Sequence, residues 1–108
     1  MSTYVLEHIV EEHVKIVYVC KAEGHGDVIG DVPGLKYCFS KQDCLEVNSS
    51  LICWSPWMLV DDLEVRFEGA YVGDELKTIA FQARNVNCSL SPEDLYSKVI
   101  NILSNLCH

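Results

Sequence analysis

The sequence predicts a single α+β domain over residues 1–108: an antiparallel sheet of about four to six strands with a C-terminal helix packed on one face. Two observations predict this class. Apolar and polar residues alternate between residues 63 and 84, which is typical of antiparallel strands covered on one face only. After residue 91 the apolar residues recur every three to four positions, which is typical of an amphipathic helix.

The segment from residue 63 to residue 84 predicts a β-hairpin. Its turn is expected at Gly73-Asp74-Glu75, because glycine supplies a positive φ without steric cost. The side chains expected to face the core are Leu63, Val65 and Phe67 on the first strand and Ile79, Phe81 and Ala83 on the second.

Residues 91–106 predict the helix. Ser91 is a suitable N-cap, and Pro92 suits the first helical position, where its missing N–H has no intrahelical partner. The apolar stripe that must be buried comprises Leu95, Val99, Ile102, Leu103 and Leu106. The apolar side of the hairpin is the nearest surface that can cover it.

The earlier part of the chain gives weaker signals. Residues 3–13 fit either a second helix, by the spacing of their apolar residues, or a strand, by their β-branched content. We prefer the helix. Residues 14–22, 35–39 and 50–54 predict strands, and Asn48-Ser49-Ser50 predicts a turn. The segment 23–34 contains four glycines but no phosphate-binding motif, so we interpret it as a connecting loop.

Six cysteines and the start of the chain bear on the compartment. Met1-Ser2-Thr3-Tyr4 lacks a basic leader region, so we expect no signal peptide and a cytoplasmic location. In that compartment the cysteines are expected to be free, structural thiols. No pair has the C-x₂-C spacing of structural zinc sites, and we expect neither a metal nor a cofactor.

Charge narrows the class of partner. The formal net charge is −8, from 16 acidic and 8 basic residues. This balance disfavours nucleic acid and anionic membranes as partners, because both are bound mainly through Lys and Arg. It favours a basic protein partner, since opposite charge accelerates encounter.

No arrangement of residues predicts catalysis. The adjacent carboxylate pairs fall in segments expected to be solvated turns or a helix start, where their pKa would not be shifted by burial. The serines lack the G-x-S-x-G context of a hydrolase nucleophile. We therefore expect the protein not to be an enzyme.

The function expected first is a small acidic module that neutralises a basic, nuclease-type toxin by direct binding, as an immunity protein does. Trp54-Ser55-Pro56-Trp57 and the acidic residues after it suggest where contact would occur, since tryptophan and arginine dominate binding hot spots. The expected partner-binding residues are Trp57, Asp61, Asp62, Glu64, Arg66, Glu68, Tyr71, Asp74 and Glu75. One alternative is an adaptor subunit that oligomerises through an aromatic patch. Another is a small-ligand binder or enzyme that uses the glycine-rich segment 24–34 as a lid.

Overall fold

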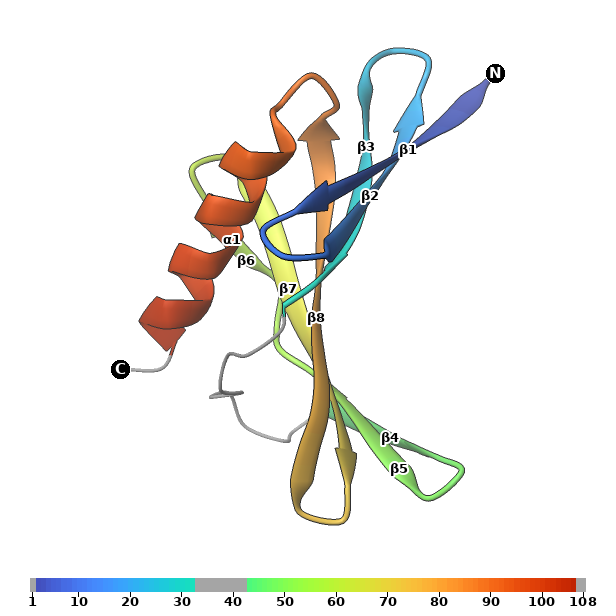
Figure 1. Cartoon of the computed structure of the whole chain (residues 1–108), viewed down its shortest axis with the longest axis vertical. Coiled ribbons are helices and arrows are strands. Elements are labelled where there is room, and N and C mark those ends of the chain that lie inside the picture. The colour runs from blue at the N-terminus through green and yellow to red at the C-terminus, as the bar shows by residue number, and fades with distance from the viewer. Residues whose placement is uncertain (1, 33–42, 107–108) are drawn as a thin grey trace.

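The computed structural model describes residues 2–32 and 43–106. In this part of the chain, eight strands form one antiparallel sheet and one α-helix covers one of its faces (Figure 1). The elements are β1 (Thr3–Val10), β2 (Val14–Lys21), β3 (His25–Asp31), β4 (Asp43–Val47), β5 (Ser50–Trp54), β6 (Met58–Val60), β7 (Leu63–Val72), β8 (Glu75–Asn87) and α1 (Pro92–Leu106).

The sheet is organised around the long strands β7 and β8. The strand order is β1-β2-β3-β8-β7-β5-β4, and β6 also pairs with β7. The edge of β7 that faces away from β8 is shared, because β6 pairs with its first residues and β5 with its last ones. Figure 1 shows α1 and β6 beside the upper part of the sheet, while the β4–β5 hairpin projects at the opposite end.

The core lies between α1 and the inward face of the sheet, and it confirms the predicted hairpin. Phe67 lies opposite Phe81 in the β7–β8 ladder, and both side chains are completely buried. Val65 and Ala83 form the next inward pair. The buried residues of the helix are Leu95, Tyr96, Val99, Ile102 and Leu103, so four members of the predicted stripe are buried.

The predicted start of the helix is also confirmed. The Ser91 Oγ accepts a hydrogen bond from the Asp94 N–H at 3.2 Å, as an N-cap side chain does. The Leu95 N–H donates to the Ser91 carbonyl at 3.0 Å, which is the first helical hydrogen bond. Leu106, the last residue of the predicted stripe, is only partly buried.

The preferred helix over residues 3–13 is wrong. This segment is β1 followed by a turn, and β1 runs antiparallel to β2, with Val10 opposite Val14. Val5 and Ile9, which helical spacing placed on a buried stripe, are 58% and 62% exposed. The spacing of these hydrophobic residues therefore did not indicate a buried helical face. The β-branched content of the segment predicted the strand correctly.

The predicted glycine-rich loop is wrong over residues 25–31, which form β3. Gly26, Val28 and Gly30 point inward and are buried, whereas the residues between them are exposed. A Cβ at Gly26 would overlap the Val19 carbonyl, and one at Gly30 would overlap the Phe81 ring. The glycines therefore allow close packing within the sheet. With β1 and β3 added, the sheet exceeds the four to six strands expected.

Shorter predictions had mixed outcomes. The strands expected at residues 14–22 and 50–54 are β2 and β5. The turn between β4 and β5 is Asn48-Ser49, whose φ values of 46° and 70° are those of a type I′ hairpin turn. The strand expected at residues 35–39 lies outside the described residues.

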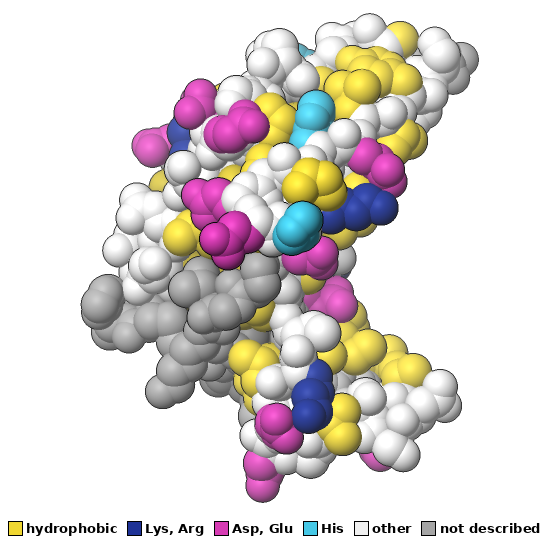
Figure 2. All heavy atoms as spheres, in the orientation of Figure 1, with side chains coloured by type: hydrophobic (Ala, Val, Ile, Leu, Met, Phe, Trp, Pro, Cys, Tyr) yellow, Lys and Arg dark blue, Asp and Glu magenta, His cyan; other side chains and the backbone are white. Residues whose placement is uncertain are grey.

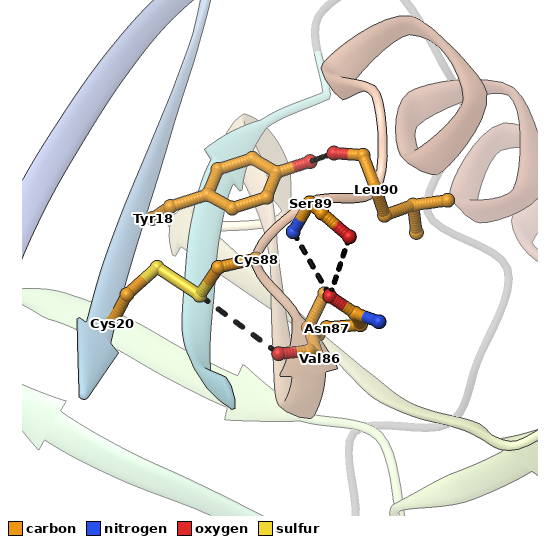
Figure 3. The surroundings of a disulfide bond; sticks show 7 residues. All are labelled: Tyr18, Cys20, Val86, Asn87, Cys88, Ser89 and Leu90. Atoms are coloured by element: carbon orange, nitrogen blue, oxygen red, sulfur yellow. Dashed lines mark hydrogen bonds between the residues drawn. A yellow bond between two sulfur atoms is a disulfide. The ribbon is translucent and has the colours of Figure 1, made fainter. Parts of the chain in front are cut away.

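The expectation of free thiols is wrong for four cysteines. Cys20 is bonded to Cys88, and Cys44 is bonded to Cys53. The first disulfide ties β2 to the segment that joins β8 to α1 (Figure 3). The second joins directly opposed residues of the β4–β5 hairpin.

The connection between β8 and α1 is held by further polar contacts beside the first disulfide (Figure 3). The Tyr18 hydroxyl donates to the Leu90 carbonyl at 3.1 Å, and the Asn87 Oδ1 accepts hydrogen bonds from both the N–H and the hydroxyl of Ser89. Burial raises the pKa of Tyr18 to about 12, with a smaller contribution from the carboxylate of Glu93. These contacts fix where α1 begins against the sheet.

Candidate protein-binding surface

The face of the sheet opposite α1, called the outward face below, carries the polar side chains of β7. Glu64, Arg66 and Glu68 are half-buried there and alternate with buried residues of the inward face. This confirms the alternation predicted for the first strand of the hairpin. The cross-strand partners of Glu64, Arg66 and Glu68 on β8 are Arg84, Gln82 and Ala80.

Two tryptophans and two arginines gather on the outward face: Trp54, Trp57, Arg66 and Arg84, called the Trp–Arg cluster below. The Arg66 guanidinium carbon lies 4.9 Å from the centre of the Trp57 ring and 5.9 Å from that of Trp54. The Arg84 guanidinium carbon lies 4.0 Å from the Trp57 ring centre. All three distances are within the range of cation–π attraction.

Ser55 fixes the chain between the two tryptophans. Its N–H donates to the Phe67 carbonyl at 2.9 Å, and its hydroxyl oxygen accepts a hydrogen bond from the Phe67 N–H at 2.8 Å. The hydroxyl itself donates to the Pro56 carbonyl at 3.0 Å. Ser55 is 4% exposed, so these bonds are shielded from water. The serine thereby holds the corner that carries Trp54 and Trp57 against β7.

The charged groups of the Trp–Arg cluster are paired. The Arg84 Nε lies 2.6 Å from a Glu64 carboxylate oxygen, and the Trp54 Nε1 donates to Glu68 at 2.9 Å. The Arg66 Nε donates to the Gln82 side-chain oxygen at 2.7 Å. The hydrogen bond from Arg84 lowers the pKa of the Glu64 carboxyl, and the same bond raises the pKa of Arg84.

Hydrophobic side chains continue the outward face beyond the cluster, because directly opposed residues of neighbouring strands share a face. Arg66 lies opposite Gln82, Gln82 opposite Ile29, and Ile29 opposite Val17. The apolar field formed in this way comprises Val5, Ile9, Val17, Val19 and Ile29. Val5, Ile9 and Ile29 are each more than half exposed.

The outward face was expected to be open and acidic, from the net charge and the polar residues of the hairpin. The carboxylates of Glu64 and Glu68 there are engaged by Arg84 and Trp54. The neighbouring strands add both hydrophobic residues and the charged residues Glu7, Lys15 and Asp27. Figure 2, which views the molecule as in Figure 1, shows acidic side chains interspersed with hydrophobic ones on the side that it draws.

The structure brings together only part of the predicted set of partner-binding residues. Trp57, Glu64, Arg66 and Glu68 lie in or beside the Trp–Arg cluster. Asp61 and Asp62 form the exposed turn between β6 and β7, with φ values of 49° and 66°. Asp74 and Glu75 lie at the other end of β7, and Tyr71 points to the inward face and is 7% exposed.

The predicted set of partner-binding residues omitted Trp54, Gln82 and Arg84, although the Trp54-Ser55-Pro56-Trp57 stretch had been predicted as a region of contact. The signal for two of them was available, because Gln82 and Arg84 share the polar side of the predicted second strand. What was missing was the strand register that sets Arg84 opposite Glu64.

In the described part of the chain, no three His, Cys, Asp or Glu side chains gather as metal ligands would. The glycine-rich segment cannot act as a lid over residues 25–31, because they are a strand inside the sheet. A depression of about 260 Å³ beside β3 is lined by residues that include Lys21, His25 and Asp27.

Within residues 2–32 and 43–106, no helix is long and apolar enough to span a bilayer. Comparison of the chain with protein-family models, with curated proteins and with solved structures gave no match.

Proposed function

We propose that this chain is a non-catalytic protein-binding module whose contact surface is the outward face around the Trp–Arg cluster. The observation that carries the proposal is the cluster itself: two guanidinium groups lie within cation–π distance of the half-buried Trp57 ring, beside an exposed apolar field. Tryptophan and arginine supply most hot-spot energy in protein interfaces, and neighbouring apolar contacts exclude water from them.

The charge of the chain supports a basic partner. Because the charges of Arg66 and Arg84 balance those of Glu64 and Glu68, the net charge of −8 lies on the rest of the chain. Acidic turns such as Asp61-Asp62 lie at the end of β7 that carries Glu64. An interface with an aromatic centre and an acidic periphery would attract a basic protein through long-range charge and hold it through apolar contact. An inhibitor of a nuclease-type toxin remains the specific form of this proposal.

The disulfides bear on where such binding occurs. Cystines persist in oxidising compartments and are rare in the reducing cytosol. The Cys20–Cys88 and Cys44–Cys53 bonds therefore favour an extracytoplasmic site of action over the cytoplasmic location expected from the sequence. In this form of the proposal, the chain meets its partner outside the cytosol.

The test is a quantitative capture experiment with three baits: the unchanged protein, Trp57→Ala and Val60→Ala. Val60 is the matched control, since it lies three residues from Trp57, is 41% exposed and lies opposite Leu63 on the inward face. Baits are incubated with the extracellular and periplasmic or luminal fractions of the source organism. We expect a basic protein that the unchanged and Val60→Ala baits recover and the Trp57→Ala bait loses.

Salt dependence separates the two parts of the proposal. Recovery that falls as ionic strength rises supports charge-driven encounter with a basic protein. Recovery that is unaffected by salt contradicts the basic partner while leaving the surface intact. If the Trp57→Ala bait recovers the same proteins as the unchanged one, the Trp–Arg cluster is not the contact surface.

A further inference from the structure

The edge strand β1 lacks the protection that edge strands normally carry. It ends the sheet order, and no described residue pairs with its outer edge. Its eight residues include neither proline nor glycine, and its one carboxylate, Glu7, is paired with Lys15 at 3.0 Å. By contrast, β6 has only three residues, and the five residues of β4 include Asp43 and Glu46. Native proteins use short strands and charges of this kind to prevent edge-to-edge pairing.

Large hydrophobic side chains are exposed on both faces of β1. Tyr4 and Leu6 share the inward face with Cys20 and Tyr18 of β2, yet they remain 42% and 38% exposed. Val5 and Ile9 extend the apolar field on the outward face. Burial increases only at the end of β1, where Val10 is 4% exposed.

The backbone pattern shows which groups of β1 point to the free edge. The Ala22 N–H donates to the Ser2 carbonyl at 3.1 Å, which continues the β1–β2 register by one pair. In an antiparallel ladder, hydrogen-bonded and non-hydrogen-bonded pairs alternate. The even-numbered residues of β1 therefore bond to β2, and the N–H and C=O groups of Thr3, Val5, Glu7 and Ile9 point outward.

We propose that β1 pairs antiparallel with β1 of a second copy of this chain, about a two-fold axis at Leu6. In this register Val5 lies opposite Glu7 and Thr3 opposite Ile9 of the other copy. These are the residues with outward backbone groups, so each donor on one strand meets an acceptor on the other. The two sheets become one continuous sheet, with the α1 helices on the same side.

Side-chain complementarity selects this register. Leu6 meets Leu6 at the axis in a non-hydrogen-bonded pair, where side chains approach most closely. Tyr4 of one copy meets His8 of the other, and His8 already contacts Tyr18 edge-to-face at 5.4 Å between ring centres. A shift of the axis to Glu7 would place Glu7 opposite Glu7, which like-charge repulsion disfavours. A shift to Val5 would shorten the paired part of β1 from residues 3–9 to residues 3–7.

The pairing of one edge strand is a small interface, of the kind found in weak and reversible complexes. It does not depend on the proposed function, because β2 and β3 separate β1 from β8 and β7, which carry Arg84 and Arg66, and Trp54 lies still farther along the sheet on β5. It would join the two apolar fields across the dimer axis.

Amide hydrogen exchange measured by NMR at micromolar and millimolar concentrations tests the pairing without any substitution. The amides of Tyr4, Leu6 and His8 should be protected at both concentrations, because they bond to β2. The amides of Val5, Glu7 and Ile9 should exchange at least tenfold more slowly at the higher concentration. Equal exchange of these three at both concentrations would overturn the proposal.

Sedimentation velocity compares the self-association of the unchanged protein with that of two variants. We expect the unchanged protein to shift from 12.2 kDa towards twice that mass as concentration rises. Leu6→Lys, which places two ammonium groups at the axis, should raise the dissociation constant at least tenfold, whereas Leu45→Lys on the other edge strand should leave it unchanged. Circular dichroism checks that both variants are folded. A monomer at all concentrations, or loss of association only in Leu45→Lys, would refute pairing through β1.

Discussion

The two disulfides differ sharply in the length of chain that they close, and this difference predicts unequal effects on stability. In the loop-entropy description, a sequence separation of 68 corresponds to about 4.4 kcal/mol for Cys20–Cys88. The separation of 9 for Cys44–Cys53 corresponds to about 2.6 kcal/mol. Replacing Cys20 and Cys88 by alanine should therefore cost about 1.8 kcal/mol more than replacing Cys44 and Cys53.

The two double variants are well matched as controls for each other. Each disulfide joins one completely buried cysteine, Cys20 or Cys53, to one partly buried cysteine, Cys88 or Cys44. The loss of packing should therefore be similar, and the difference should report mainly the length of the closed loop.

The assay is equilibrium unfolding in urea, with intact-mass analysis to confirm that the remaining bond has formed. The expected difference of about 1.8 kcal/mol corresponds to melting temperatures that differ by about 7–14 °C. Equal losses, or a larger loss for the Cys44 and Cys53 pair, would show that loop closure does not govern the stability of this domain.

Three further predictions test single elements. Gly30→Ala should lower the free energy of unfolding, measured in urea, by about 1–3 kcal/mol, because the added Cβ meets the completely buried ring of Phe81. Asp27→Ala, on the exposed side of the same strand, should change it by less than about 0.5 kcal/mol. Ser91→Ala should lower the free energy of unfolding by about 1 kcal/mol, because it removes the N-cap of α1. Ser91→Asp should keep most of that stability, since aspartate can also cap the helix. The folded-state pKa of Tyr18 is raised from 10.0 to about 12, so its contribution to stability should be complete below pH 10 and decline as the pH rises through 12. Unfolding measured across this range should show that decline in the unchanged protein and a smaller one in Tyr18→Phe.

The parts of the fold that sequence predicted correctly are those whose signals are local. The β7 alternation and the Ser91-Pro92 helix start depend only on neighbouring residues, and both formed as expected. The failures concern pairing between distant segments. The local sequence around Gly26 and Gly30 is typical of a loop. Their role in the sheet becomes clear only from the close approach of Val19 and Phe81, which the local sequence does not predict.

The strand register explains why Arg84 was missed. The two-residue turn after Val72 pairs Tyr71 with Leu76, but the next pair is Ala70 with Thr78. The extra residue, Lys77, shifts the ladder by one position and sets Arg84 opposite Glu64. Extending the register from the observed two-residue turn without the bulge would set Glu64 against Ala83, a residue of the inward face, and nothing in the sequence marks the bulge.

The cysteines show how one assumption controlled several predictions. Free thiols were expected because the start of the chain suggested a cytoplasmic protein, and Cys20 and Cys53 fit apolar strand patterns equally well as thiols or as cystines. Spacing could not decide, since the partners are joined by the folded sheet: Cys44 meets Cys53 only through the β4–β5 register. The prediction of free thiols therefore depended on the expected compartment, and not on the strand patterns.

The two disulfides also act at different distances from the proposed contact surface. Cys20–Cys88 secures the start of α1, on the face away from the Trp–Arg cluster. Cys53 immediately precedes Trp54 and lies opposite Gly69 of β7, so the Cys44–Cys53 bond restrains the strand that carries a cluster residue. Surfaces that are ordered before binding lose less conformational entropy on association. The Cys44–Cys53 bond should thus contribute less than Cys20–Cys88 to the free energy of unfolding but more to the affinity for the partner. It restrains the residue before Trp54, and the hydrogen bonds of Ser55 restrain the residue after it.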